Sequence, residues 1–232
     1  MKKTASVLLA LVGLQLGLNT LLPQNIVSAQ GGQTLTTKIT VTPLEKSIFE
    51  ETNKIRANPQ SYIPILEAFK ARNIPGTNNF KRREGDEYNL ETHEGVKAID
   101  EAIEYLRNQK PVPVLERSVG LTMAAKDYAA DQKDNISEGH NGNDGSTMET
   151  RLKRYGKIQG TAGENLSFRV GHHNNSGQDV VVALIVDDNV PNRGHRKNIF
   201  NPQYKKTGVA CGEQKQMDNI CVMDYASAYE DN

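Results

Sequence analysis

The sequence has few cysteines, no tryptophan and no excess of charge of either sign. It contains two cysteines in 232 residues, and its 28 lysines and arginines balance 28 aspartates and glutamates. Two cysteines are too few for a scaffold held together by many disulfides. A chain without net charge is a poor candidate for general nucleic-acid binding, which requires a strong basic excess. Internal repeats and low-complexity tracts are also lacking. We therefore expect a globular protein without a nucleic-acid partner.

Only the N-terminus contains a long apolar run. Lys2 and Lys3 precede a run from about Ala5 to Leu18, and Val27-Ser28-Ala29 offers small residues for cleavage. This order is typical of a secretory signal peptide over residues 1–29. The run is short and is interrupted by glycine and glutamine, so an uncleaved anchor is the less favoured alternative. We expect a secreted, extracellular protein with no stable membrane span after cleavage.

The remaining chain predicts a single domain. Cleavage would leave about 200 residues, which is enough for one domain with a substantial core. Residues 30–41 are rich in glycine, glutamine and threonine and predict a flexible leader, and we expect the domain over residues 42–229. Residues 73–91 are polar and include Lys81-Arg82-Arg83. We interpret them as a solvated surface loop rather than an anion site.

Capping residues and apolar spacing predict the helices. Thr42 and Ser176 each begin a capping box, Ser118 is a candidate N-cap, and Ser146 with Glu149 forms a further capping box. The helices expected from these signals cover residues 43–57, 62–69, 96–109, 119–133, 147–155 and 177–188. Residues 162–170 predict a strand, and a C-terminal hairpin ends the domain.

The two cysteines lie in the predicted hairpin. Cys211 and Cys221 occupy two strand-like segments, which a polar connection over residues 213–219 separates. A hairpin would set these cysteines side by side, and export would permit a disulfide between them. A redox pair or a metal site would usually show tighter spacing. We therefore expect a disulfide that fixes the register of the hairpin.

Two histidines and several acids form the most promising chemical group. His140, Glu164 and His195 each follow a glycine, and Asp187 and Asp188 lie near a helix end, where the helix dipole disfavours acids. Such a set could hold a divalent cation or serve as acid and base around a polar substrate. No HExxH or CxxC signature is present, and two histidines alone would hold zinc weakly. Surface or purely structural roles remain the alternative.

Three basic residues surround His195 in the sequence. They could steer an anion, but we expect them to pair with the two neighbouring aspartates. These residues are Arg193, Arg196 and Lys197.

Five short motifs, taken in order, resemble the CAP superfamily, which includes cysteine-rich secretory proteins, antigen 5 and plant pathogenesis-related proteins. The resemblance covers about residues 45–228, essentially the whole mature chain. The motifs are Asn53–Asn58, Gly139–Ser146, Gly163–Leu166, Gly194–Ile199 and Gly208–Gly212.

The resemblance implies an α+β fold, a three-layer α/β/α sandwich with a small antiparallel central sheet. It also implies a large cleft lined by His140, Glu164, His195 and a second acid, for which Asp187 is the best match and Asp188 the neighbour. The family usually has glutamate at that place. Residues 73–109 look like an insertion relative to compact members. The family's common tryptophans and its cysteine-rich extension are lacking, so functions tied to that extension do not transfer.

The functional expectation is a secreted, non-catalytic binding module. Its cleft would hold Zn²⁺ or another divalent cation, with a sterol, a fatty acid or a protein as the effector ligand. The alternative is a metal-assisted or glutamate-dependent hydrolase in which Glu164 acts as general base on water. A third reading is a structural cluster whose acid–histidine hydrogen bonds tie loops together.

Overall fold

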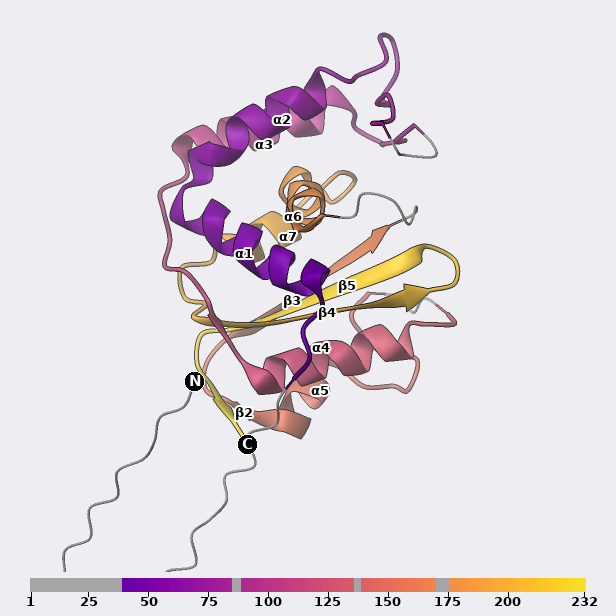
Figure 1. The fold of residues 1–232 in the computed structure, drawn as a ribbon. Helices are drawn as coiled ribbons and strands as arrows, with labels where there is room; N and C mark the ends of the chain where they lie inside the picture. The colour runs from indigo at the N-terminus through magenta and orange to yellow at the C-terminus, as the bar shows by residue number, and fades with distance from the viewer. Residues whose placement is uncertain (1–38, 85–88, 136–138, 170–175) are drawn as a thin grey trace, which may run out of the picture. The chain divides into compact units, whose positions relative to one another are not determined.

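The computed structural model describes residues 39–84, 89–135, 139–169 and 176–232 (Figure 1). The predicted signal peptide and most of the predicted leader lie outside the described residues. The described residues belong to one compact unit. Within the part of the chain that is described, no helix has the length and apolar character that a membrane span requires.

The described residues contain both helices and strands. The helices are α1 (Pro43–Ala57), α2 (Ile63–Lys70), α3 (Val96–Asn108), α4 (Val119–Asp131), α5 (Met148–Tyr155), α6 (Gly177–Val186) and α7 (Gly194–Ile199), with a 3-10 turn over Pro59–Tyr62. The strands are β1 (Glu116–Arg117), β2 (Gly156–Ile158), β3 (Ala162–Arg169), β4 (Lys206–Gln214), β5 (Asp218–Ala226) and β6 (Tyr229–Asp231). The predicted α+β class is confirmed.

Most of the predicted helix caps are present. Thr42 and Ser176 each complete a capping box, and the Ser118 hydroxyl accepts the first-turn hydrogen bond of α4. The prediction of Ser146 as the cap of α5 is wrong, because Thr147 accepts the hydrogen bond there instead. The main-chain N–H of Ser146 donates to the Asp144 carboxylate, which keeps Ser146 in the preceding loop.

The central sheet has the order β1-β4-β5-β3. Strands β4, β5 and β3 are antiparallel, and β1 adds two residues in parallel beside β4. Strands β2 and β6 form a separate antiparallel pair. The register places Glu164 of β3 directly opposite Asp224 of β5. That pairing brings two acids together on adjacent strands.

Helical layers cover both faces of this sheet. Helices α4 and α5 lie on one face, and α1, α6 and α7 lie on the other (Figure 1). Helices α2 and α3 form a further layer outside them, where α3 packs on α6. The α/β/α arrangement is therefore present, and residues 96–108 of the predicted insertion add to its outer side.

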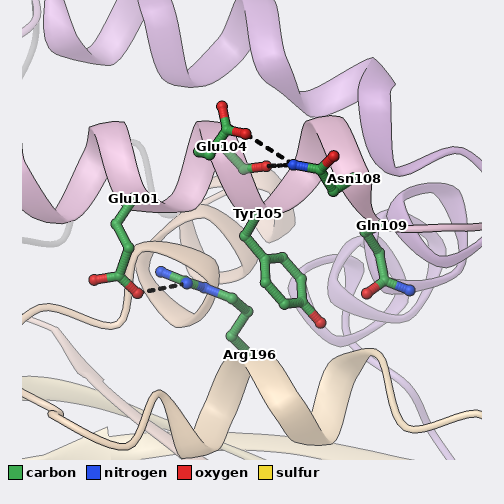
Figure 2. Close-up of a pocket in the computed structure, with 6 residues that line it drawn as sticks. All are labelled: Glu101, Glu104, Tyr105, Asn108, Gln109 and Arg196. Atoms are coloured by element: carbon green, nitrogen blue, oxygen red, sulfur yellow. Dashed lines mark hydrogen bonds and ion pairs between the residues drawn. The ribbon is translucent and has the colours of Figure 1, made fainter.

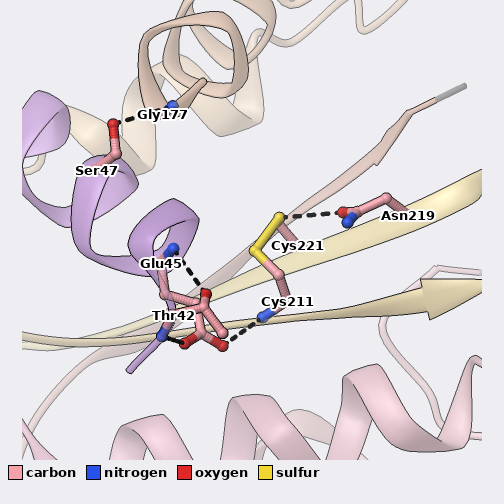
Figure 3. The surroundings of a disulfide bond; sticks show 7 residues. All are labelled: Thr42, Glu45, Ser47, Gly177, Cys211, Asn219 and Cys221. Atoms are coloured by element: carbon pink, nitrogen blue, oxygen red, sulfur yellow. Dashed lines mark hydrogen bonds between the residues drawn. A yellow bond between two sulfur atoms is a disulfide. The ribbon is translucent and has the colours of Figure 1, made fainter. Parts of the chain in front are cut away.

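The predicted disulfide joins Cys211 of β4 to Cys221 of β5 (Figure 3). The two cysteines face each other in the β4–β5 register, as the hairpin pattern predicts. Glu45 links this hairpin to α1, because its carboxylate accepts the N–H groups of both Thr42 and Cys211. The disulfide thus stands beside the start of α1.

Candidate functional site

His140 and Glu164 form the first of two histidine–carboxylate pairs. Glu164 comes from β3 and His140 from the loop after α4, and His140 Nδ1 lies 2.9 Å from Glu164 Oε1. The glutamate side chain is 1% exposed, whereas the histidine side chain is 50% exposed. An ionised carboxylate only accepts hydrogen bonds, so Nδ1 carries the proton and donates it. This tautomer leaves the Nε2 lone pair of His140 available to a ligand.

Arg151 holds the other oxygen of Glu164. Arg151 Nη2 donates to Glu164 Oε2 at 2.8 Å, and both side chains are 1% exposed. The guanidinium also lies over the Tyr128 ring, 4.1 Å from its centroid. Both oxygens of Glu164 therefore already have partners within the protein. No sequence motif indicated Arg151, because α5 reaches Glu164 only when α5 packs against β3.

Asp224 stands behind Glu164 in the sheet and is fully buried. Burial raises the pKa of Asp224 well above its usual range, and the neighbouring Glu164 carboxylate raises it further. If Asp224 were ionised, neither of its oxygens would have a hydrogen-bond donor. A proton on Asp224 removes this problem, because the neutral acid can donate a hydrogen bond to Glu164. Burial and the neighbouring Glu164 carboxylate thus both favour the neutral form of Asp224.

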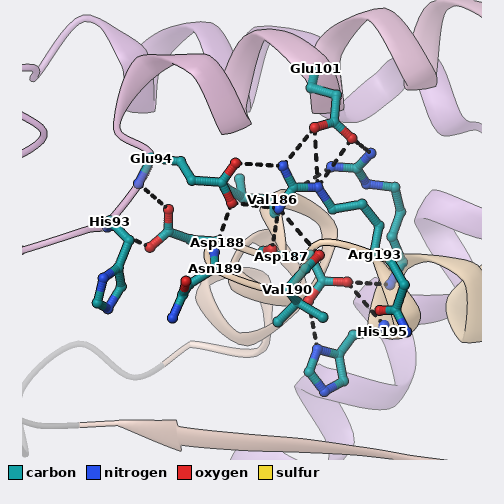
Figure 4. A network of polar contacts seen from close by, with 12 residues as sticks. His93, Glu94, Glu101, Val186, Asp187, Asp188, Asn189, Val190, Arg193 and His195 are labelled. Atoms are coloured by element: carbon teal, nitrogen blue, oxygen red, sulfur yellow. Dashed lines mark hydrogen bonds and ion pairs between the residues drawn. The ribbon is translucent and has the colours of Figure 1, made fainter.

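His195 and Asp187 form the second pair (Figure 4). Asp187 ends α6 in a left-handed conformation, and its Oδ1 lies 2.6 Å from His195 Nδ1. Its Oδ2 accepts the N–H groups of His195 and Arg196 at 3.0 and 3.2 Å. The unfavourable position of an acid at the end of α6 is therefore compensated by the first amides of α7. The side chains are 1% exposed for Asp187 and 25% for His195.

The neighbouring Asp188 does not contact either histidine ring. Its two oxygens accept the main-chain N–H groups of His93 and Glu94, both at 2.8 Å (Figure 4). Asp188 thereby ties the segment before α3 to the end of α6. Of the two candidate acids, the structure pairs Asp187 with His195 and gives Asp188 this separate contact.

The expected pairing of the arginines with the two aspartates is wrong. Arg193 donates to the carboxylates of Glu94 and Glu101, at distances between 2.6 and 3.1 Å, and to the main-chain oxygen of Asp187. Arg196 donates to Glu101 and to two carbonyls of α6. These glutamates lie more than ninety residues earlier and reach the arginines because α3 packs on α6. The network ties α3 to the loop that carries His195.

Replacing Arg193 with lysine should weaken the attachment of α3. Lysine keeps the charge but cannot donate in the forked geometry that both glutamates use. We expect the free energy of unfolding to fall by about 1–2 kcal/mol and amide hydrogen exchange in α3 to accelerate relative to α4. The control is Arg107→Lys, because this arginine lies on α3 with a 56% exposed side chain. Equal exchange in α3 of both variants would contradict the expectation.

The same network has a predicted acid dependence. Hydrogen bonding from Arg193 lowers the pKa of Glu94 from its ordinary 4.5 to about 2. Because the folded pKa is the lower one, the pair contributes stability above about pH 4.5 and loses it as pH falls toward 2. Acid unfolding of the wild type and of Glu94→Gln measures this contribution. The difference between their free energies of unfolding should vanish near pH 2.

A separate pocket lies between α3 and α7 (Figure 2). Its volume is about 510 Å³. Tyr105 lies above Arg196, which contributes to the wall together with polar residues of α3 and Gln109 (Figure 2). Among the described residues, none that lines this pocket has an aliphatic side chain. The six lining residues are Glu101, Glu104, Tyr105, Asn108, Gln109 and Arg196.

A family model described as the cysteine-rich secretory protein family, CAP, matches residues 101–225, which is more than half of the chain. The chain belongs to the CAP family. This assignment confirms the resemblance that the short motifs suggested. It also agrees with the α+β architecture. No curated protein sequence matches the chain.

Two solved structures are similar to parts of this CAP domain. One is an extracellular protein containing an SCP domain from Bacillus anthracis, with 22% identity, a TM-score of 0.39, and coverage of 56% of this chain and 39% of that protein. The other is an outer surface protein from Borrelia burgdorferi, with 23% identity, a TM-score of 0.40, and coverage of 59% of this chain and 95% of that protein. This chain thus spans less than half of the Bacillus anthracis protein. Neither likeness strengthens the family assignment, since both TM-scores are below 0.5.

The four candidate residues of this CAP domain form two pairs rather than one dense cluster. In the described residues, no group of three or more histidine, cysteine, aspartate or glutamate side chains could hold a metal ion. The sequence did not indicate Arg151 and Asp224, which lie beside Glu164 on the side away from His140. The only available signal for Asp224 was its position as an acid inside an apolar strand segment, Ile220–Ala226.

Proposed function

We propose that this protein is an exported CAP-family binding module in which His140 and His195 present their Nε2 atoms to a divalent cation. One observation supports this most directly. Each histidine has its Nδ1 fixed by a carboxylate whose side chain is 1% exposed, while the ring itself stays accessible. Metal-binding histidines commonly have this arrangement, because the carboxylate sets the tautomer and raises the basicity of the ring.

The donor chemistry fits a weakly held cation. Neutral imidazole suits Zn²⁺, Cu²⁺ and Ni²⁺. Two imidazoles leave further coordination positions to water or to a ligand group, so we expect a dissociation constant near 1 µM, or about −8 kcal/mol. In this proposal Glu164 and Asp187 orient the two rings and do not themselves contact the cation. Such a cation would supply a positive point at which an anionic or carbonyl group of a partner could bind.

Hydrolysis is the less favoured alternative. A general base needs an oxygen that can take a proton from water within hydrogen-bond reach. Both oxygens of Glu164 are occupied by His140 and Arg151, and its side chain is 1% exposed. If purified protein turns over peptide or ester substrates and Glu164→Gln abolishes this activity, the hydrolase replaces the binding module as the better proposal.

The two candidate classes of effector ligand are a lipid and a protein. A sterol or fatty acid needs a continuous apolar wall. The pocket between α3 and α7 has one aromatic ring, Tyr105, and otherwise polar or charged side chains. We therefore favour a protein partner for this module.

Zinc titration by calorimetry tests the cation site. The chain without residues 1–29 should bind Zn²⁺ with a dissociation constant near 1 µM at neutral pH, and the double variant His140→Ala/His195→Ala should lose this binding. The matched controls are His93→Ala, whose histidine is exposed, and His172→Ala/His173→Ala, which removes the adjacent pair from the chain. Both controls should bind as the wild type does. Equal binding by the His140/His195 double variant would refute the proposed site.

A further inference from the structure

Two adjacent residues of β3, Glu164 and Asn165, each form hydrogen bonds within one of the two histidine–carboxylate pairs. Adjacent residues of a strand point to opposite faces of the sheet. Glu164 points toward α5 and holds the ring of His140. Asn165 points toward α7, where its Nδ2 donates to the main-chain oxygen of His195 at 3.1 Å. The two histidines are therefore connected through a single peptide unit of the sheet.

Asn198 closes the connection from the other side. It lies on α7, three residues after His195, and its Nδ2 donates to Asn165 Oδ1 at 2.9 Å and to the main-chain oxygen of Glu164 at 3.3 Å. Asn165 is fully buried and also donates to the Tyr225 hydroxyl at 3.4 Å. We call Asn165 and Asn198 the asparagine pair. Only an amide side chain can donate twice and accept at the same place, which is what Asn165 does here.

Gly163 lets α7 come this close to β3. A Cβ at Gly163 would lie 2.4 Å from the Tyr204 hydroxyl oxygen and 3.1 Å from Asn198 Oδ1. The first distance is too short for a side-chain carbon and the second is tight, so a larger residue would displace the Tyr204 hydroxyl and shift the Asn198 amide. Glycine, glutamate and asparagine at positions 163 to 165 thus have three connected roles. Gly163 leaves room for the Asn198 side chain of α7. Glu164 holds the ring of His140, and Asn165 holds the main chain of His195.

We propose that the asparagine pair positions His195 relative to His140 and thereby sets the distance that the two imidazoles must span to hold one cation. This inference rests on the proposed cation site. Nitrogen–zinc bonds of 2.0–2.1 Å are short and vary little. A site made of two histidines therefore depends on where the backbone places them. The asparagine pair does not contact the cation, and it determines which cation radius fits.

Asn198→Ser is the variant that tests this role. Serine keeps the site uncharged but is too short to reach both Asn165 Oδ1 and the Glu164 carbonyl. We expect about tenfold weaker Zn²⁺ binding, the size of effect that loss of a supporting contact around a metal ligand usually causes. The matched control is Asn201→Ser, because Asn201 follows α7 and its side chain accepts from Gln203 outside the asparagine pair. The control should bind Zn²⁺ as the wild type does.

The ratio of Zn²⁺ to Cd²⁺ affinity separates positioning from simple destabilisation. A variant that only folds less well should lose affinity for both cations by the same factor. A variant that changes the spacing of the histidines should change the ratio by at least threefold, because Cd²⁺ is larger. In a His195→Ala background, Asn198→Ser should have no further effect on any residual binding.

The outcomes are distinct. No Zn²⁺ binding by the wild type overturns the proposed cation site and this inference together. Binding by the wild type with an unchanged cation ratio in Asn198→Ser overturns the inference alone, and so does an equal loss in Asn201→Ser. A changed ratio confined to Asn198→Ser supports the asparagine pair as positioning residues.

Discussion

Replacing Arg56 with methionine is expected to lower the free energy of unfolding by about 3–5 kcal/mol. Arg56 lies on α1 and is 0% exposed. Among the described residues, none of its hydrogen-bond partners is a carboxylate. Burial lowers its pKa to about 10, so the side chain is still cationic at neutral pH. Its guanidinium donates to the main-chain oxygens of Pro113, Ile199, Asn201 and Tyr204.

The size of this effect follows from the main-chain oxygens that would lose the hydrogen bond donated by Arg56. Methionine fills much of the same volume but donates no hydrogen bond, so the carbonyl oxygens of Ile199 and Tyr204, whose hydrogen bonds to Arg56 are buried, lose this donor. Each buried polar group without a partner costs about 1–3 kcal/mol. The affected segments include the end of α7, so Arg56 also supports the element that carries His195.

Urea unfolding followed by circular dichroism measures the loss. Tyrosine fluorescence can serve as a second probe because the chain has no tryptophan. Arg107→Met is the matched control, since its side chain is 56% exposed and its ion pairs with Glu67 and Glu104 lie on the surface. The control should lose less than about 1 kcal/mol. A loss of the same small size in Arg56→Met would show that the buried carbonyls find other donors.

Replacing Arg151 with methionine is expected to cost about 3–5 kcal/mol as well. The change removes the guanidinium that contacts the buried Glu164 carboxylate, and Asp224 lies on the other side of this carboxylate. Removing one partner of a buried ion pair leaves an uncompensated charge in a low-dielectric environment. The ring of Tyr128 also loses the guanidinium that lies over it.

Two further variants show whether the charge is the cause. Arg154→Met on the same helix removes an arginine whose side chain is 38% exposed, so it should cost less than about 1 kcal/mol. Adding Glu164→Gln to Arg151→Met removes the stranded charge and should recover part of the lost stability. If the double variant is as unstable as the sum of the two single variants, charge is not the cause of the loss.

Features set by neighbouring residues could be predicted from the sequence. The N-caps Thr42, Ser118 and Ser176 were correct, because a cap depends on a side chain and an amide two or three residues away. The disulfide between Cys211 and Cys221 was correct for the same reason, since a short hairpin brings its own ends together. The cap of α5 was wrong by one residue, because Asp144 holds Ser146 in the loop.

Contacts between distant segments could not be predicted in this way. The sequence placed Arg193 beside two aspartates, whereas the fold turns its guanidinium toward Glu94 and Glu101 on α3. Nearness in the chain is a poor guide for a long flexible side chain at the end of a short helix. Which acids it meets depends on the helix that packs beside it. Arg151 and Asp224 were missed for the same reason.

The sequence by itself determined the family, the α+β class, the disulfide and the four candidate residues of the site. The family motifs and the hairpin are local patterns, and local patterns can be recognised without knowledge of the packing. Only the tertiary structure decided which acid holds which histidine, that Asp187 rather than Asp188 faces His195, and that Asp224 favours its neutral form beside Glu164. Those properties depend on burial and on distances between elements, and both arise only when α5, α7 and β3 pack together.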